Sequence, residues 1–587
     1  PGSNAGLTMN GTPYTLIHSV DQLAAQDDAT GTATGSYALA QDLDAAAWSA
    51  ANMGATSVVA KLSGTLSGLG HTISNLTLNA STKNFVGLIG QIPRNTTAVV
   101  RDIGMKNVNI TGKSSVGALL GASRGTVAIS DAYITATDNN KPSIVSAWGG
   151  GVGGLIGGGG KNFTMRDSFS DADVMIKAGD GQMAGGLVGA AENFTTITTI
   201  TNCHATGKVT SISSNGLSRI GGLVGSILKI AISNSYTTGD VMSTGDNVGG
   251  LCGEAWAGSV SNSFSTGNIT GRDGVGGLVG DGGNIDNCWA TGNVTGRGGL
   301  GGLVGSGGGY LTRSFATGDV RTNSTGGTGY LGGLAGLWKD GDITYSFATG
   351  NVIGNGRDGH GDGATAHMGG LVGNLRWGGS ISDSYATGDV KGGFSYVGGL
   401  VGNGSNITRS WASGRVSVTP RGSCFGGLVG QGMNVSDSYW NADTTGQSNA
   451  IGHTAAGYVP TNTKGLTNAQ WKDLPYYRDG TIDQVLADRA AAAQAAAYAA
   501  ARQAAFKADA RGEAGHATGR SLQQDADPSR ETGTAGMLAD GDRSFTPLNK
   551  HIVLHDSYDH SVYMKTIGAK GAHFGLEGSS SGKKKKR

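Results

Sequence analysis

Histidine and aspartate residues gather in one stretch of the chain whose side chains could bind a metal ion. The stretch RDGHGDGATAH brings Asp358, His360, Asp362 and His367 close together in sequence. Imidazole and carboxylate groups are ligands for divalent transition metals. Their spacing matches no specific metal-binding motif, and polar loops collect these residue types without binding metal. We therefore predict no metal site and no cofactor, and we keep the four residues as a candidate binding loop.

Acid–base catalysis would need paired carboxylates, or a basic residue beside one, grouped on one face of the protein. Glutamate is nearly absent from the repeated part of the chain, where only Glu192 and Glu254 occur. Aspartate recurs behind a Thr-Gly pair, at Asp240, Asp319 and Asp389. Aspartate at such a place is first of all a turn residue. We predict no catalytic residues and a protein that is not an enzyme.

An aromatic residue recurs at one position of the repeats and forms a column if the repeats stack. Rings on the outside would bind sugar rings, whereas rings on the inside would belong to the core. Isoleucine often lies four residues earlier, on the same face of a strand, and isoleucine is expected inside. We predict core packing and retain Trp289, Tyr385 and Trp411 as candidate binding residues. With His204 as the exception, the column comprises Phe169, Tyr236, Phe264, Trp289, Phe315, Phe347, Tyr385, Trp411 and Tyr439.

These residues are positioned by a repeated unit in which a glycine pair returns roughly every thirty residues. Behind the pair come stretches such as ISNSYTTGDV (232–241) and ISDSYATGDV (381–390). Short apolar stretches between turn residues predict three short strands per unit. We expect the glycines at the corners, because glycine reaches positive φ at little cost. The pairs begin at Gly153, Gly185, Gly221, Gly249, Gly276, Gly301, Gly332, Gly369, Gly398 and Gly426.

A unit this short cannot bury its own apolar face, whereas stacked units can. The sequence therefore predicts an all-β fold, a β-solenoid, followed by an Ala-rich α-helix and a largely irregular C-terminal tail. The expected segments are 1–150 as N-terminal rungs, 151–450 as the repeat core, 451–482 as a transition, 483–511 as the helix, and 512–587 as a polar tail ending in a basic run.

The composition argues against several functions. The 587 residues include 107 glycines and carry a formal net charge of +1, so we expect no nucleic-acid partner. No apolar run reaches about 18 residues, as a membrane-spanning helix requires. The four cysteines lack the spacing of a metal site or a disulfide framework, and we expect Cys203 and Cys288 to be unpaired. The chain begins Pro-Gly-Ser, which predicts a processed or excised piece.

Several motifs carry a family resemblance. The segment SGTLSGLGHTISNLTL with the following FVGLIG, the serial units such as VGGLVG and DSYATGDV, and the closing DSYWNADTTGQS and GLTNAQW lie between residues 12 and 471. Together they resemble the GLUG-repeat region of filamentous-haemagglutinin-like bacterial exoproteins, which are two-partner-secretion adhesins. The resemblance implies a right-handed parallel β-helix and export through an outer-membrane β-barrel transporter. GLUG repeats also occur in IgA-cleaving metallopeptidases, but this chain has no His-Glu-x-x-His motif.

From these observations we expect a structural adhesin, secreted or displayed on the outer surface of a Gram-negative bacterium. Its rod would present loops to a host or bacterial cell-surface glycan or protein. Two alternatives stay open. The chain could be a self-assembling extracellular fibre subunit that binds copies of itself through uncapped strand edges. It could also be a carbohydrate-active β-helix enzyme, a lyase or hydrolase, if the fold brings two carboxylates together in a cleft.

Overall fold

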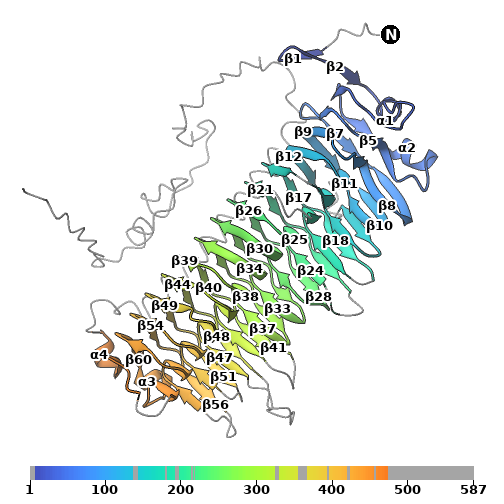
Figure 1. The fold of residues 1–587 in the computed structure, drawn as a ribbon. Helices are drawn as coiled ribbons and strands as arrows, with labels where there is room; N and C mark the ends of the chain where they lie inside the picture. The colour runs from blue at the N-terminus through green and yellow to red at the C-terminus, as the bar shows by residue number, and fades with distance from the viewer. Residues whose placement is uncertain are drawn as a thin grey trace, which may run out of the picture. The chain divides into compact units, whose positions relative to one another are not determined.

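The computed structural model describes most of the chain up to residue 472. The described residues are 7–135, 143–160, 162–178, 181–191, 197–212, 216, 218–323, 329–354, 366–392, 396–418, 424–454 and 458–472. They form a parallel β-helix in which each strand pairs with the equivalent strand of the next turn (Figure 1). The turns follow one another along the solenoid in sequence order. The predicted all-β solenoid is confirmed. The expected Ala-rich helix at 483–511 and the tail at 512–587 lie outside the described residues.

One turn of the solenoid, here called a coil, contributes to five parallel ladders. The coil at residues 273–296 pairs with the next coil through five strand pairings. The prediction of three strands per unit is therefore wrong, because turn residues divide the predicted runs further. The coil at residues 273–296 consists of β33 (Asp273–Gly276), β34 (Val279–Asp286), β35 (Trp289–Ala290) and β36 (Val294–Gly296). Its partners are β37 (Gly298–Gly301), β38 (Val304–Gly307), β39 (Leu311–Thr312), β40 (Phe315–Ala316) and β41 (Val320–Thr322).

The glycine pairs are required by the close approach of neighbouring coils. A Cβ atom added at Gly277 would collide with the carbonyl oxygen of Gly302, which belongs to the next coil. A Cβ atom at Gly276 would collide with the carbonyl oxygen of Val279. Neither Gly276 nor Gly277 has positive φ, nor does any other described member of the pairs. The expectation of positive φ at these corners is therefore wrong, and steric exclusion of any side chain explains the glycines.

Positive φ occurs instead two residues before each aromatic position. Asn287, for example, has a φ of 51° and precedes Trp289. Asparagine and aspartate tolerate this conformation because their short polar side chains form local hydrogen bonds. The left-handed residue turns the chain between two ladders and changes which side chains face inward. The residues at this position are Asp131, Asp167, Asn202, Asn234, Asn262, Asn287, Arg313, Tyr345, Asp383, Arg409 and Asp437.

The core runs along the inside of the coils and is built from valine, leucine and isoleucine. In the coil at 273–296, Val275, Leu278 and Ile285 are all buried in it. Strict alternation along a strand would place Val275 and Leu278 on opposite faces. Both lie inside because the glycine pair between them forms a corner where the chain turns around the core. The apolar residues of each coil therefore meet those of the coils above and below.

A buried serine follows eight of these eleven left-handed residues and links neighbouring coils. The Ser346 hydroxyl accepts a hydrogen bond from the backbone N–H of Ser314 at 3.2 Å, and it donates one to the Thr344 carbonyl at 2.8 Å. The Ser384 hydroxyl accepts in the same way from the Ser346 N–H at 3.1 Å. Each hydroxyl thus satisfies one buried backbone donor and one acceptor that the strands leave unpaired.

Cysteine replaces this serine in two coils. Cys203 and Cys288 are fully buried, and both thiols are free, as predicted. Burial raises the pKa of each thiol to about 12, which keeps both sulfur atoms protonated at neutral pH. Their sulfurs lie 3.3 Å and 3.2 Å from the carbonyl oxygens of Thr201 and Asp286, the place that the serine hydroxyl takes elsewhere.

The N-terminal end begins with an antiparallel hairpin. β1 (Leu7–Met9) pairs with β2 (Thr12–Ile17), and β2 then starts the parallel ladders by pairing with β3 (Ser36–Leu39). Two short helices lie among these first coils, α1 (Val20–Ala24) and α2 (Ala46–Ala51). The parallel pairing thus begins well before the first glycine pair.

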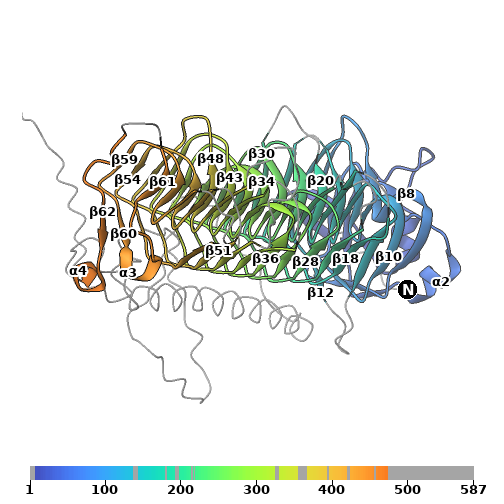
Figure 2. The ribbon, with the colours of Figure 1, turned by 90° about the horizontal axis from the view of Figure 1, so that it is seen from below.

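Two short helices close the described C-terminal end. α3 (Ala442–Thr445) follows β60 (Tyr439–Asn441), and α4 (Asn468–Lys472) follows β62 (Lys464–Leu466). Figure 2 shows both helices at the orange end of the solenoid. β62 extends the ladder of β60, and it leads the chain into α4.

Candidate functional site

The recurring aromatic residues form one continuous stack. Neighbouring rings lie nearly parallel, with interplanar angles of 0–9° and centroid distances of 4.2–6.0 Å. Parallel strands hold equivalent residues directly above one another, so a repeated aromatic position becomes a stack. In chain order the stack contains Tyr133, Phe169, His204, Tyr236, Phe264, Trp289, Phe315, Phe347, Tyr385 and Trp411.

This stack lies on the outer side of the coils. Cys288 and Ala290, which flank Trp289, both belong to the main core. Side chains alternate along a strand, so Trp289 points away from that core. The prediction that the aromatics share the inward face of the preceding isoleucine is wrong, because the left-handed Asn287 changes the phase between Ile285 and Trp289.

The stack is nevertheless buried. Trp289 is 9% exposed and Trp411 is 5% exposed, because each ring covers the faces of its neighbours. At the C-terminal end, Trp471 of α4 packs edge-on against Trp411 with a centroid distance of 5.5 Å. A sugar ring needs an accessible ring face, and Trp289 and Trp411 present none. The arrangement of Trp289, Tyr385 and Trp411 indicates packing, as expected, although on the other side of the sheet.

His367 is the only member of the candidate binding loop that lies in the described residues; Asp358, His360 and Asp362 lie outside them. It begins β47 (His367–Gly369) and is 4% exposed. Its ring centroid lies 5.4 Å from that of Tyr330 and 5.2 Å from that of Tyr396. Burial, and secondarily the Arg376 guanidinium, lower the pKa of His367 to about 4. The imidazole is therefore neutral at physiological pH.

The recurring aspartates form a ladder of side-chain to backbone hydrogen bonds. Asp319 accepts from the N–H of Asn351 at 2.9 Å, and Asn351 accepts from the N–H of Asp389 at 3.0 Å. Asp240 accepts from the N–H of Asn268 at 2.8 Å in the same manner. Each of these carboxylates fixes a turn of the next coil, which agrees with a structural role.

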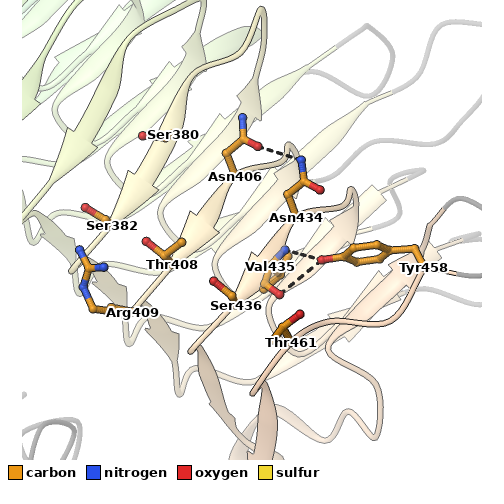
Figure 3. A pocket seen from close by; sticks show the side chains of 10 residues that line it. All are labelled: Ser380, Ser382, Asn406, Thr408, Arg409, Asn434, Val435, Ser436, Tyr458 and Thr461. Carbon is orange, nitrogen blue, oxygen red and sulfur yellow. Dashed lines mark hydrogen bonds between the residues drawn. The ribbon is translucent and has the colours of Figure 1, made fainter.

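A shallow polar groove of about 500 Å³ lies near the C-terminal end of the described coils (Figure 3). Side-chain amides and hydroxyls line it, and the Asn434 amide donates to Asn406 at 3.0 Å. The Tyr458 hydroxyl accepts from the Val435 N–H at 2.6 Å, and so fixes the ring beside the groove. Arg409 contributes a cation but is paired with Asp383 through two bonds of 2.7 Å. Such a surface suits hydroxyl-rich ligands.

Sequence reasoning did not single out the groove. Its serine and threonine residues, such as Ser382, Thr408 and Ser436, directly follow the buried position of their strands. The sequence does contain a pattern that corresponds to the groove, namely a serine or threonine after each of these Ile or Val residues. Its meaning depends on neighbouring coils, which place these hydroxyls side by side only in the stacked structure.

The described residues contain neither a cluster of metal ligands nor a membrane-spanning helix. No group of three or more His, Cys, Asp or Glu side chains there is arranged to hold a metal ion. Among the helices in the same part of the chain, none is long and apolar enough to cross a membrane.

Comparison with known proteins identifies the repeat. Three stretches match the family model described as the GLUG motif, at residues 180–210, 244–270 and 364–391. Halomucin of Haloquadratum walsbyi is 34% identical over 159 residues, which is 25% of this chain and 2% of halomucin. A crystal structure of a candidate immunoglobulin A1 protease from Bacteroides ovatus aligns with 49% of this chain and 77% of its own, with a TM-score of 0.31 and 19% identity. The chain is therefore a β-solenoid protein that carries GLUG motif repeats.

Proposed function

We propose that the chain is a structural segment of an extracellular adhesin, in which the β-helix holds binding surfaces in fixed positions. The observation that carries this proposal is the unbroken parallel ladder from β2 to β62. Segments of very different length are accommodated between coils, such as residues 354–366 between β46 (Val352–Ile353) and β47, without interrupting the strand pairing. Loops on a rigid scaffold are where binding residues concentrate.

An extracellular location is supported by the GLUG motif repeats and by the similarity to halomucin, whose name describes a mucin. We further propose that the chain is secreted by a Gram-negative bacterium or displayed on its outer surface, with an outer-membrane transporter as partner during export. The binding partners would be glycans or proteins of host or bacterial cell surfaces. The proposed function involves no catalysis and no cofactor.

A binding screen tests this proposal. The fluorescently labelled full chain is titrated onto immobilised polysaccharides and onto intact bacterial and epithelial cells. Saturable binding to at least one surface, competed by unlabelled chain, is the expected result. Unsaturable or absent binding on every surface would contradict the adhesin and favour a purely structural rod.

A further inference from the structure

One exposed tryptophan stands on a bulge in the middle of the solenoid. In β30 (Cys252–Ser261), the residues Trp256, Ala257 and Gly258 face a single residue, Gly283, of the neighbouring strand β34. Ala257 has a φ of 47°, and Trp256 is 55% exposed. Bulges of this kind re-aim a side chain away from the regular pleat. The bulge therefore presents one indole to solvent, unlike the covered rings of the aromatic stack.

Two carboxylates lie beside this indole on adjacent coils. Glu254 of β30 and Asp281 of β34 are directly opposite each other in the ladder. The Trp256 indole N–H donates to Asp281 Oδ2 at 3.4 Å, and the Ser226 hydroxyl donates to Glu254 Oε2 at 3.0 Å. Glu254 is only 5% exposed. Trp256 and Asp281 therefore form one continuous site, and the buried Glu254 pairs with Asp281 in the ladder beside it.

Each carboxylate is paired with a cation from another coil. Arg219 forms an ion pair with Glu254. Lys339 reaches across the intervening coil to Asp281, with its Nζ 3.2 Å from Oδ1. The two ion pairs cancel, and the exposed Asp340 carboxylate beside Gly308 adds one negative charge. The Asp281 contacts are long, so its oxygens retain capacity to accept hydrogen bonds from a ligand.

The surface beside Trp256 is built mainly from glycines, and the Asp340 side chain lies against Gly308 in this surface. Gly282 and Gly283 follow Asp281 on the next coil, and Gly307 and Gly308 lie one coil further along. Tyr310, which is 48% exposed, stands beyond them in the coil after β34. Tyr310 belongs to the second coil after that of Trp256, which corresponds to a rise of roughly 10 Å along the solenoid. Figure 2 shows β30, β34 and β43 (Ala335–Trp338) in this order along the solenoid, and β38 pairs with both β34 and β43.

We propose that this surface, with Trp256 as its platform and Asp281 and Lys339 as its polar contacts, binds an uncharged oligosaccharide. An exposed indole offers an apolar face for the C–H side of a pyranose ring. Carboxylate and ammonium groups then satisfy the hydroxyls, as polar groups in ligand sites fix orientation and specificity. The additional Asp340 carboxylate repels acidic sugars, which favours neutral ones. The proposal rests on the proposed adhesin function and names its ligand class.

The test measures binding of the full chain to cellohexaose, mannohexaose, chitohexaose and hexagalacturonate by titration calorimetry and on glycan-coated surfaces. The variants are Trp256→Ala and Asp281→Asn. Trp377→Ala is the matched control, because Trp377 is also exposed, at 74%, but lies in a different turn of the solenoid. Circular dichroism and the urea midpoint verify that each variant is folded.

The expected result is binding to at least one neutral hexaose, at least tenfold weaker in both Trp256→Ala and Asp281→Asn and unchanged in Trp377→Ala. A change from 0.1 to 0.5 M NaCl should alter the dissociation constant less than about twofold, because the ligand is uncharged. Equal loss in Trp256→Ala and Trp377→Ala would overturn the site as non-specific adsorption to exposed indoles. Salt-sensitive preference for hexagalacturonate would overturn the neutral class.

The failure of this site can be separated from failure of the proposed function. If the wild-type chain binds cells or glycans and the Trp256 and Asp281 variants bind equally well, the site is wrong and the adhesin proposal stands. If the wild-type chain binds neither the four hexaoses nor any cell surface, both proposals are overturned together.

Discussion

At the scale of single residues, the buried serine explains how coils are joined where strands are shortest. The strands on either side of Ser346 are β44 (Asp342–Thr344) and β45 (Phe347–Ala348), too short to pair all the backbone groups between them. The Ser346 hydroxyl takes the place of the missing ladder bond by accepting from Ser314 N–H and donating to Thr344. Serine at this position is therefore part of the hydrogen-bond framework of the solenoid.

The substitution Ser346→Ala should lower the free energy of unfolding by about 1–3 kcal/mol, because it leaves a buried N–H and a buried carbonyl without their partner. Urea denaturation followed by circular dichroism measures the change. Ser417→Ala is the control, since Ser417 is half-buried in β56 (Val416–Val418) and should change stability by less than about 0.5 kcal/mol. Equal effects of the two substitutions would refute the role of the buried hydroxyl.

His367 should make the protein less stable in mild acid. Its folded-state pKa of about 4 lies below the ordinary value of 6.5, so the unfolded chain binds the proton more readily between these two values. The free energy of unfolding therefore falls as pH drops from about 6.5 towards 4, by up to about 2–3 kcal/mol. In His367→Phe the fall in the free energy of unfolding that comes from protonation of His367 should be absent.

Urea titrations of both proteins at pH 7.0 and 4.5 measure the difference. The quantity of interest is how much more stability the wild type loses than the variant between the two pH values. An identical loss in both proteins would show that the proton equilibrium of His367 does not contribute. Comparing the two proteins cancels the contribution of other titrating groups that they share.

At the scale of elements, periodic glycine pairs with short apolar runs were sufficient to predict stacked β-coils. The number of ladders was not predictable in the same way. A run such as Ile285 to Ala290 looks like one alternating strand, but Asn287 takes a left-handed conformation and divides it. The alternation of apolar and polar residues does not show where a left-handed residue changes which side chains face the core. The side on which Trp289 lies depended on this one backbone angle.

Close packing between coils makes certain glycines irreplaceable. A Cβ atom at Gly318 would collide with the carbonyl oxygen of Gly292 in the preceding coil. Gly318→Ala should therefore destabilise the protein by more than about 2 kcal/mol or prevent it from folding, because the added Cβ would meet backbone atoms, which cannot move aside as a flexible side chain can.

Gly149 provides the matched control for this prediction. An added Cβ there would meet only the carbonyl oxygen of Ala178, at 3.7 Å, an ordinary contact. Gly149→Ala should change the urea midpoint little, and soluble expression of both variants provides a second readout. Tolerance of alanine at Gly318 would contradict the conclusion that close approach of neighbouring coils excludes a side chain there.

At the scale of the whole molecule, the sequence predicted the architecture better than the binding surface. Repetition determines the solenoid because every coil repeats the same solution. A binding site instead arises where the repetition is broken, as at the bulge of Trp256, and where residues far apart in sequence meet. Lys339 and Asp281 are distant in sequence and belong to coils that are two turns apart, so their pairing becomes visible only in the folded chain.

The adhesin proposal and the enzyme alternative make opposite predictions about the same polysaccharides. Glu254 and Asp281 lie side by side, as a glycoside-cleaving pair would, but each is paired with a cation and Glu254 is buried. In a binding site the carbohydrate should dissociate unchanged. In an enzyme it should leave with a broken glycosidic bond.

The most direct measurement is therefore the release of new reducing ends from polysaccharides that the full chain binds. The full chain is incubated overnight at micromolar concentration with each bound polysaccharide, and reducing ends and unsaturated uronates are quantified. The account predicts saturable binding with no release above the level of a heat-denatured sample. Release that is abolished by Asp281→Asn would contradict it and would identify the chain as a carbohydrate-cleaving enzyme.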